Sequence, residues 1–246
     1  MVLIVAFVLI SRLSSPGSQS KTSTDSTVVS QVTHVSTSVI DAVGTGGATV
    51  PMKQVTGAAL TGSSGKPELL YVGAEWCPYC AAERWAMIVA LSQFGSFGGL
   101  HFTTSSSTDV FPDTNTFSLH GITYSSSYVD FVAVETQDRN RNPLDSITAQ
   151  GQAVAQTYDP DNSIPFLDFG NRYTMIGQGV PPDPLKGLTW QQIGADLSNP
   201  KSPVTKAIVG NANYLSAVIC KLPGTNTAPI CSDSTIKQIA TLLPAS

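Results

Sequence analysis

Charged residues are scarce in this chain of 246 residues: Lys, Arg, Asp and Glu make up 12% of it, about half the share usual in globular domains. The 13 Lys and Arg against 17 Asp and Glu give a net charge of −4, and no basic run occurs. Phosphates and anionic lipids are bound through clustered Lys and Arg, so nucleic-acid binding is excluded. The hydrophobic content of 41% still allows a full core.

Metal-ligating residues are few as well. The three histidines are isolated from one another: His34, His101 and His120. Cys220 and Cys231 are separated by ten residues and lack the C-x-x-C spacing that would complete a zinc site. The other two cysteines, Cys77 and Cys80, do have the C-x-x-C spacing, and half of a zinc site remains an alternative interpretation of this pair. We expect no metal and no cofactor.

No apolar run is long enough to span a bilayer, which takes about 20 residues. Residues 1–10 are apolar, but no basic region precedes them and no clear cleavage site follows. We interpret residues 1–12 as a truncated membrane anchor or signal-like segment, with a buried strand or helix as the alternative. In residues 13–38, 14 of 26 are Ser or Thr, which predicts a flexible tether. The folded domain would then be residues 39–246, on the outer face of a membrane.

The segment Trp76-Cys77-Pro78-Tyr79-Cys80 carries the most chemical information. The nearly unbroken apolar run 68–74 before it predicts a buried strand. From 78 to about 94, apolar residues recur at helical spacing, and proline is tolerated in a first helical turn. A strand that runs into two cysteines three apart, with a helix following, is typical of thiol–disulfide oxidoreductases.

The positions of the two cysteines suggest their roles. Residues three apart in a first helical turn share a face, so Cys77 and Cys80 can form a disulfide or separate as a dithiol. Cys77 would lie at the helix N-terminus, where unpaired N–H groups and the helix dipole favour the thiolate. It would attack a substrate disulfide, and Cys80 would resolve the mixed disulfide. Trp76, Pro78 and Tyr79 would flank the nucleophile and contact the substrate.

A second signal is Ile164-Pro165, at the start of a predicted strand well downstream of the cysteines. In thioredoxin-like folds, an apolar residue and a cis-proline at such a place face the C-x-x-C motif and leave a backbone edge for an extended substrate peptide. A trans-proline at a strand start is the common alternative. The order of the two elements favours the cis form here.

The rest of the chain alternates between strand and helix patterns. Strands are predicted at 100–104 and 128–134, a loop at 109–116, a helix at 143–158, and a hairpin at 163–173 with its turn at Gly170-Asn171. Helices are predicted at 189–197, 204–222 and 234–243, and residues 39–60 as a loosely structured lead-in. The expected class is α/β: a thioredoxin-like fold, with a central mixed sheet flanked by helices and a helical C-terminal extension.

With these elements in place, residues 68–176 resemble a thioredoxin-fold domain. The closer resemblance is to an uncharacterised thioredoxin-like family, domain of unknown function 929. It rests on the stretches 75–85 and 103–135 and on the surroundings of the late cysteine pair, 219–221 and 230–232. The resemblance implies a membrane-anchored, extracytoplasmic protein and brings no established substrate.

Two departures from ordinary thioredoxins limit what the resemblance carries over. The dipeptide between the cysteines is Pro-Tyr, similar to glutaredoxins, and Tyr71 stands where thioredoxins place a buried carboxylate. The usual proton acceptor for Cys80 is therefore absent. Glu75 or Glu83 could act as a proton relay in its place. The alternative for Glu83 is a solvated helix face paired with Arg84.

The late pair, Cys220 and Cys231, lies across the loop between two predicted helices. A structural disulfide is expected there, which fits an oxidising compartment. The alternative is an electron relay, in which this pair exchanges with Cys77 and Cys80.

The sequence thus predicts a membrane-anchored thiol–disulfide oxidoreductase that acts on exported proteins containing cysteines, together with an unknown redox partner. One alternative is a non-catalytic peptide-binding or scaffold module in which Cys77–Cys80 is a static disulfide. Another is a copper metallochaperone, although no Met-rich or His-rich tract supports it. The direction of electron flow does not follow from the sequence.

Overall fold

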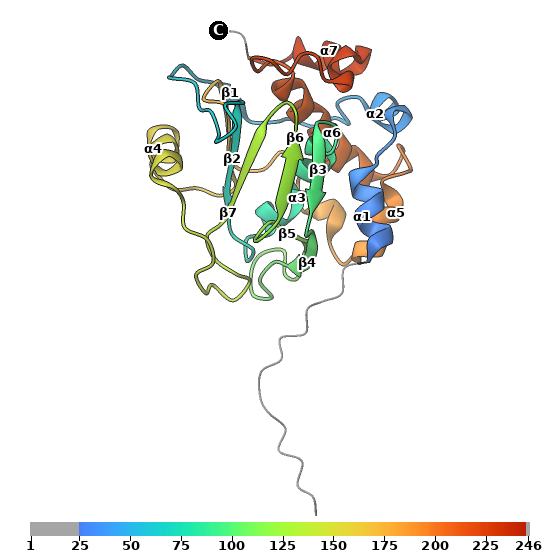
Figure 1. Ribbon diagram of the computed structural model, residues 1–246. Coiled ribbons are helices and arrows are strands. Elements are labelled where there is room, and N and C mark those ends of the chain that lie inside the picture. Colours follow the sequence, from blue (N-terminus) through green and yellow to red (C-terminus); the bar gives the residue numbers. More distant parts are fainter. Residues whose placement is uncertain (1–24, 245–246) are drawn as a thin grey trace, which may run out of the picture.

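The structure is a computed structural model that describes residues 25–244 (Figure 1). Its α-helices are α1 (Ser26–Thr33), α2 (Thr37–Val43), α3 (Pro78–Leu91), α4 (Ala149–Tyr158), α5 (Trp190–Asp196), α6 (Pro203–Ile219) and α7 (Ser234–Ala240). Its strands are β1 (Met52–Gln54), β2 (Glu68–Gly73), β3 (Gly95–Gly98), β4 (His101–Thr104), β5 (Asn115–Ser118), β6 (Thr123–Ser126), β7 (Asp130–Glu135), β8 (Phe166–Phe169) and β9 (Tyr173–Ile176). Two short 3-10 helices are η1 (Asp183–Leu185) and η2 (Pro229–Ser232).

The main sheet has five strands in the order β1-β9-β8-β2-β7. Strand β2 is an inner strand next to the edge strand β7; it is parallel to β7 and antiparallel to β8, so the sheet is mixed. Strand pairs β3–β6 and β4–β5 form two further two-stranded sheets, and all four strands lie between α3 and β7 along the chain. The expected α/β class, with a mixed sheet flanked by helices, is confirmed.

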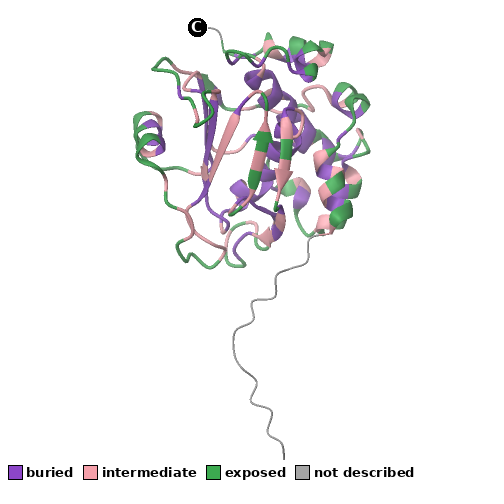
Figure 2. Ribbon diagram, in the orientation of Figure 1, coloured by how far each residue is buried: buried purple, intermediate pink, exposed green. Residues whose placement is uncertain are grey.

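Helices cover both faces of the main sheet. Because strand side chains alternate between faces, Leu69 and Tyr71 of β2 join the large core formed with α3 and α6, whereas Leu70 joins a smaller core beneath α4. Figure 1 shows α4 on one side of the sheet and α3 and α6 on the other. Figure 2 shows β2 and α6 as largely buried, while α4 turns much of its surface to solvent. The segment that carries the cysteines therefore starts from a strand that is almost entirely buried.

The local predictions around the cysteines are confirmed. The run at 68–74 forms β2 and the helix predicted at 78–94 forms α3. The hairpin predicted at 163–173 is present as β8 and β9, but its second strand continues to residue 176. Gly170 and Asn171 both have positive φ, 62° and 56°, as a type I′ hairpin turn requires. The three C-terminal helices also lie where they are predicted, as α5, α6 and α7.

The predicted tether is wrong for its second half. Residues 26–33 form α1, capped by the Asp25 side chain, which accepts a hydrogen bond from the Thr27 N–H at 2.9 Å. Val28 and Val32, four residues apart, are fully buried where α1 packs against α5 and α3. Residues 37–43 form α2. Residues 1–24, with the predicted anchor and the first half of the tether, lie outside the described residues.

Three more expectations need correction. The helix predicted at 143–158 begins only at 149, because Leu144 and Asp145 instead donate their backbone N–H groups to the carbonyls of Thr136 and Glu135 at the end of β7. The lead-in at 39–60 is more ordered than expected: it holds most of α2 and the edge strand β1, which pairs with β9. Loop 109–116 ends in β5, which begins at residue 115.

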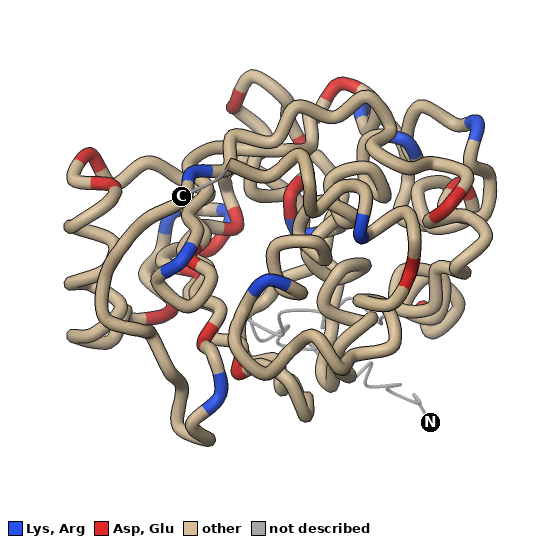
Figure 3. The backbone as a smooth tube through the Cα atoms, turned by 90° about the horizontal axis from the view of Figure 1, so that it is seen from above, with Lys and Arg blue, Asp and Glu red and all other residues tan. Residues whose placement is uncertain are grey.

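The charged residues are scattered along the backbone, with Lys and Arg dispersed among Asp and Glu (Figure 3). Several of them pair: Arg139 contacts Asp113 at 2.6 Å, and Lys66 lies 3.5 Å from Asp130. The pair of Arg84 and Glu135 stands apart, because both side chains are fully buried. That pair lies close to the cysteines.

Candidate thiol site

The two cysteines lie where β2 passes into α3. Cys77 is the N-cap residue of α3, with extended backbone (φ −75°, ψ 121°), and Pro78 occupies the first helical turn. The Cys77 Sγ accepts the backbone N–H of Cys80 at 3.3 Å, the hydrogen bond that an N-cap side chain usually makes. Cys77 is 3% exposed and Cys80 fully buried, and both are free thiols. The sulfur nearer the surface is thus the one at the helix N-terminus.

The surroundings shift the pKa values of the two thiols in opposite directions. The pKa of Cys77 is lowered by hydrogen bonding from the Cys80 side chain, against the effect of burial, with further help from the Cys80 N–H and the charge of Arg84. The pKa of Cys80 is raised well above its ordinary value, mainly by burial and then by the hydrogen bond and charge of Cys77. Cys77 therefore forms a thiolate more readily than Cys80 does.

Ile164 and Pro165 meet this site from across the fold. The peptide bond between them is cis. The carbonyl oxygen of Ile164 lies 4.0 Å from the Cys77 Sγ, although 87 residues separate the two. Pro165 is buried directly before β8, the antiparallel neighbour of β2. The two segments that the sequence singled out are brought together.

Trp76 and Tyr79 flank Cys77 and are held by neighbouring loops. The Trp76 indole Nε1–H donates to the Gln137 side chain at 2.9 Å, and the Arg141 guanidinium carbon lies 3.8 Å from the centre of the Trp76 ring. Tyr79 meets Phe111 edge to face, with ring centroids 6.0 Å apart. These loops, 105–114 and 137–143, form the rim around the nucleophile.

Glu83 does not lie where the sequence placed it. It is fully buried and unpaired with Arg84, so the solvated-face interpretation is wrong. Its carboxylate accepts the N–H groups of Gly179 and Val180 at 2.9 and 3.2 Å and the side-chain amide of Asn211 at 2.5 Å. Burial raises its pKa to about 7, against these three hydrogen bonds. None of its hydrogen bonds reaches a cysteine, which argues against a relay role.

Glu75, the other relay candidate, stays near the site. It lies two residues after the end of β2, is 8% exposed, and accepts a hydrogen bond from the Thr103 hydroxyl at 3.2 Å. Its charge also contributes to raising the pKa of Glu135, after the larger effect of burial. Glu75 thus belongs to the buried group beneath the cysteines, although no hydrogen bond joins it to either thiol.

Sequence reasoning missed the ion pair of Arg84 and Glu135. The Arg84 Nε and Nη2 each donate to Glu135 at 2.7 Å, a bidentate arrangement, and Nη2 also donates to the Ala74 carbonyl at 2.7 Å. The parallel register of β2 and β7 pairs Gly73 with Glu135, which explains how the carboxylate comes to lie there. An Arg in an otherwise apolar helix was the available signal, but its neighbour Glu83 does not pair with it and its partner Glu135 lies 51 residues away.

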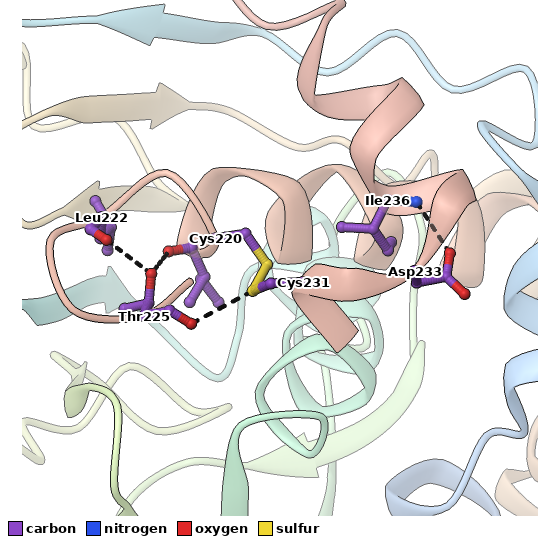
Figure 4. The surroundings of a disulfide bond; sticks show 7 residues. Cys220, Leu222, Thr225, Cys231, Asp233 and Ile236 are labelled. Atoms are coloured by element: carbon purple, nitrogen blue, oxygen red, sulfur yellow. Dashed lines mark hydrogen bonds between the residues drawn. A yellow bond between two sulfur atoms is a disulfide. The ribbon is translucent and has the colours of Figure 1, made fainter. Parts of the chain in front are cut away.

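The late cysteine pair forms a disulfide, with its Cα atoms 5.5 Å apart (Figure 4). Cys220 is the C-cap of α6 and Cys231 lies in η2. Between them, the Thr225 hydroxyl donates to the carbonyls of Ile219 and Leu222 at 2.6 and 2.8 Å, which fixes the loop inside the disulfide. This arrangement is typical of a structural cross-link.

No cluster of three or more His, Cys, Asp and Glu is placed to hold a metal within residues 25–244. His120 contacts Asp145 at 2.7 Å, while the hydrogen bonds of His34 and His101 stay within their own neighbourhoods in the chain. The same range contains no helix long and apolar enough to cross a bilayer.

Residues 53–162 match the family described as Domain of unknown function (DUF929). This range contains β2, the cysteine pair, α3 and β7. Neither curated proteins nor solved structures yield a match to the chain. The family part of the expected resemblance is therefore confirmed over residues 53–162, the segment that carries the thiol site.

Proposed function

We propose that this protein is a thiol–disulfide oxidoreductase of thioredoxin-like fold that acts on protein disulfides through Cys77 and Cys80. The observation that carries the proposal is the placement of Cys77: its sulfur caps α3, accepts the Cys80 N–H, and has a lowered pKa. A thiolate at a helix N-terminus is the arrangement that makes a cysteine nucleophilic. A second free thiol one helical turn away supplies the resolving group.

The reaction follows from these two roles. The Cys77 thiolate attacks one sulfur of a substrate disulfide, a Cys77–substrate disulfide forms, and the other substrate sulfur leaves as a thiolate. Cys80 then loses its proton and attacks the Cys77 sulfur. The Cys77–Cys80 bond forms, the second substrate sulfur leaves, and its protonation balances the proton that Cys80 lost. In the reverse direction, the Cys77–Cys80 disulfide oxidises a substrate dithiol.

The thioredoxin-like fold is part of the proposal. Support comes from the inner strand β2, its parallel partner β7 and antiparallel partner β8, the helix α3 after the cysteines, and the cis bond before Pro165. The backbone at Ile164, whose carbonyl oxygen lies 4.0 Å from the Cys77 Sγ, is where an extended substrate segment would pair. Trp76, Pro78 and Tyr79 would form the rest of the contact.

We extend the proposal to a location at the outer face of the cell membrane, with exported cysteine-containing proteins as substrates. The Cys220–Cys231 disulfide supports an oxidising compartment, and the apolar residues 1–10 support an N-terminal anchor. Fractionation of the host cell should recover the protein with the membranes. Protease added to intact cells should digest it. Recovery in the soluble cell contents would contradict this location.

The proposed activity can be tested by trapping. A Cys80→Ser variant keeps the nucleophile but cannot resolve, so mixed disulfides with substrate proteins should accumulate on Cys77 in the native host. The matched control is Cys77→Ser with Cys80→Ser, which should trap nothing. If the single variant traps no more than the double variant, the oxidoreductase proposal fails and the scaffold interpretation is favoured.

A further inference from the structure

Two buried hydrogen-bond donors near the cysteines have no partner. The Tyr71 hydroxyl and the Arg84 Nη1 are both enclosed, on residues that are fully buried, and neither makes a hydrogen bond. A buried polar group without a partner destabilises the folded state, so two such groups near the cysteines need an explanation. Both are donors, and Arg84 cannot accept a hydrogen bond at all. A transient anion is the partner that would satisfy them.

Strand β2 positions the Tyr71 hydroxyl beside Gly73, close to the segment that carries the cysteines. Tyr71 lies on the face of β2 that packs against α3, two residues before Gly73 on the same face. A Cβ built on Gly73 would overlap the Tyr71 hydroxyl and ring. The hydroxyl thus occupies space that only a glycine leaves open, at the end of the strand that leads into the cysteines.

Arg84 is fixed by hydrogen bonds to Glu135 and to the Ala74 carbonyl. It lies four residues after Cys80, on the same side of α3. Glu135 binds its Nε and Nη2, and Nη2 also donates to the Ala74 carbonyl. That carbonyl accepts the Cys77 N–H at 3.2 Å as well, so the guanidinium is tied directly to the turn that holds the nucleophile. Only Nη1 is left free.

Electrostatic effects connect these groups to both sulfurs. The Arg84 charge lowers the pKa of Cys77 and of Cys80, although hydrogen bonding dominates the first and burial the second. Tyr71 has its pKa raised, chiefly by burial, with Arg84 opposing and both cysteines adding to the rise. Glu135 and Glu75 are the carboxylates that face the same region from β7 and from the end of β2.

We propose that the Tyr71 hydroxyl and the Arg84 Nη1 form a donor pair that stabilises the Cys80 thiolate in the resolving step, where a carboxylate would otherwise accept the proton. This inference rests on the proposed function. As Cys80 gives up its proton, the pair supplies two hydrogen bonds to the developing anion. Electron density then passes from Cys80 to the Cys77 sulfur, the substrate sulfur leaves, and protonation of that sulfur completes the balance.

The test uses the full-length protein, reduced at Cys77 and Cys80, with the aromatic disulfide 5,5′-dithiobis(2-nitrobenzoate). Attack by Cys77 releases one coloured thiolate and leaves a mixed disulfide, and attack by Cys80 releases a second. Stopped-flow absorbance separates the two phases. If the unaltered protein releases only one equivalent, the proposed function fails. The inference concerns only the rate of the second phase.

In Tyr71→Phe, the second phase should be about tenfold slower at pH 7, as expected for a rise of about one unit in the Cys80 pKa, and should approach the unaltered rate at high pH. The first phase should stay within about twofold, and the unfolding free energy should not fall, because the lost hydroxyl has no partner. An unchanged second phase, equal slowing of both phases, or a loss of stability overturns the inference.

Two further variants complete the test. Tyr124→Phe is the matched control: it also removes a tyrosine hydroxyl, but one that donates to the Leu91 carbonyl at 2.9 Å, so the second phase should not change. Arg84→Lys keeps the charge but loses the fork that binds Glu135. It should slow the second phase more than the first, with recovery at high pH. A second phase in Arg84→Lys as fast as in the unaltered protein overturns the role of Arg84.

Discussion

Replacement of Glu83 by Gln should stabilise the protein at neutral and alkaline pH. Glu83 is fully buried between α3, the loop at 179–180 and α6, and burial raises its pKa to about 7. Three hydrogen bonds, from Gly179, Val180 and Asn211, oppose that rise without cancelling it. The carboxyl group therefore ionises in the folded protein only near neutral pH, far above the pKa of 4.5 expected in the unfolded chain.

The sign of the effect follows from proton binding. Between pH 4.5 and about 7 the folded state holds a proton on Glu83 that the unfolded state has lost, so the free energy of unfolding falls as pH rises through this window. The difference between the two pKa values corresponds to about 3 kcal/mol, lost progressively and fully absent above the folded pKa. Gln cannot ionise, so the variant should not show this loss.

Gln also fits the hydrogen bonds of the site. Its carbonyl oxygen can accept the N–H groups of Gly179 and Val180, as the carboxylate does. Its amide can donate to the Asn211 Oδ1, which is buried and has no partner, once the Asn211 amide turns over. The Asn211 Nδ2 then takes the place of the Oδ1 that had no partner, so we expect the number of unsatisfied groups not to rise in the Glu83→Gln variant.

Urea unfolding at pH 5, 6, 7 and 8 measures the effect. Glu83→Gln should exceed the unaltered protein by about 1 kcal/mol at pH 5 and by about 3 kcal/mol at pH 8. Asp168 falls in the same window, because burial raises its pKa to about 7, so the variant should keep a smaller pH dependence of its own. If Glu83→Gln is less stable than the unaltered protein at pH 8, or shows the same pH dependence, the reasoning is refuted.

The remaining predictions concern Asp168, the late disulfide and helix α1. Asp168→Asn should flatten the unfolding free energy between pH 4 and 7 in the same assay, and an unchanged slope would contradict its buried setting. Cys220→Ser with Cys231→Ser should lower the unfolding free energy by about 3 kcal/mol, from the entropy of an open loop, while the rate of Cys77 alkylation stays the same; a changed rate would favour the relay. Val28→Ala should lower the unfolding free energy by about 2 kcal/mol in thermal or urea unfolding, since two buried methyl groups are lost. An unchanged unfolding free energy would mean that α1 is not part of the core.

Patterns confined to one segment could be predicted from the sequence. The apolar run of β2, the helical spacing of α3 and the Gly170-Asn171 turn each depend on neighbours along the chain, and each is confirmed. The N-cap position of Cys77 followed from the same local pattern. The expected meeting of Ile164 with Cys77 came from family resemblance, because 87 residues separate them.

What could not be predicted depends on partners distant in sequence. Helix α1 was hidden by its Ser and Thr content, and only the spacing of Val28 and Val32 marks a buried face. Arg84 and Glu83 are adjacent charges on an apolar helix, yet one binds Glu135 on β7 and the other binds Asn211 on α6. Which of two neighbouring residues faces the sheet depends on the packing of the whole domain.

The central claim, that Cys77 and Cys80 form a redox-active pair, is tested most directly by equilibration with glutathione. The full-length protein is incubated across a series of ratios of reduced to oxidised glutathione, quenched with acid, and analysed by mass spectrometry. The account predicts that both thiols oxidise together to an internal disulfide, without a stable glutathione adduct, at one potential between about −270 and −120 mV. Accumulation of glutathione on either cysteine, or a pair that stays in one state across the whole series, would contradict it.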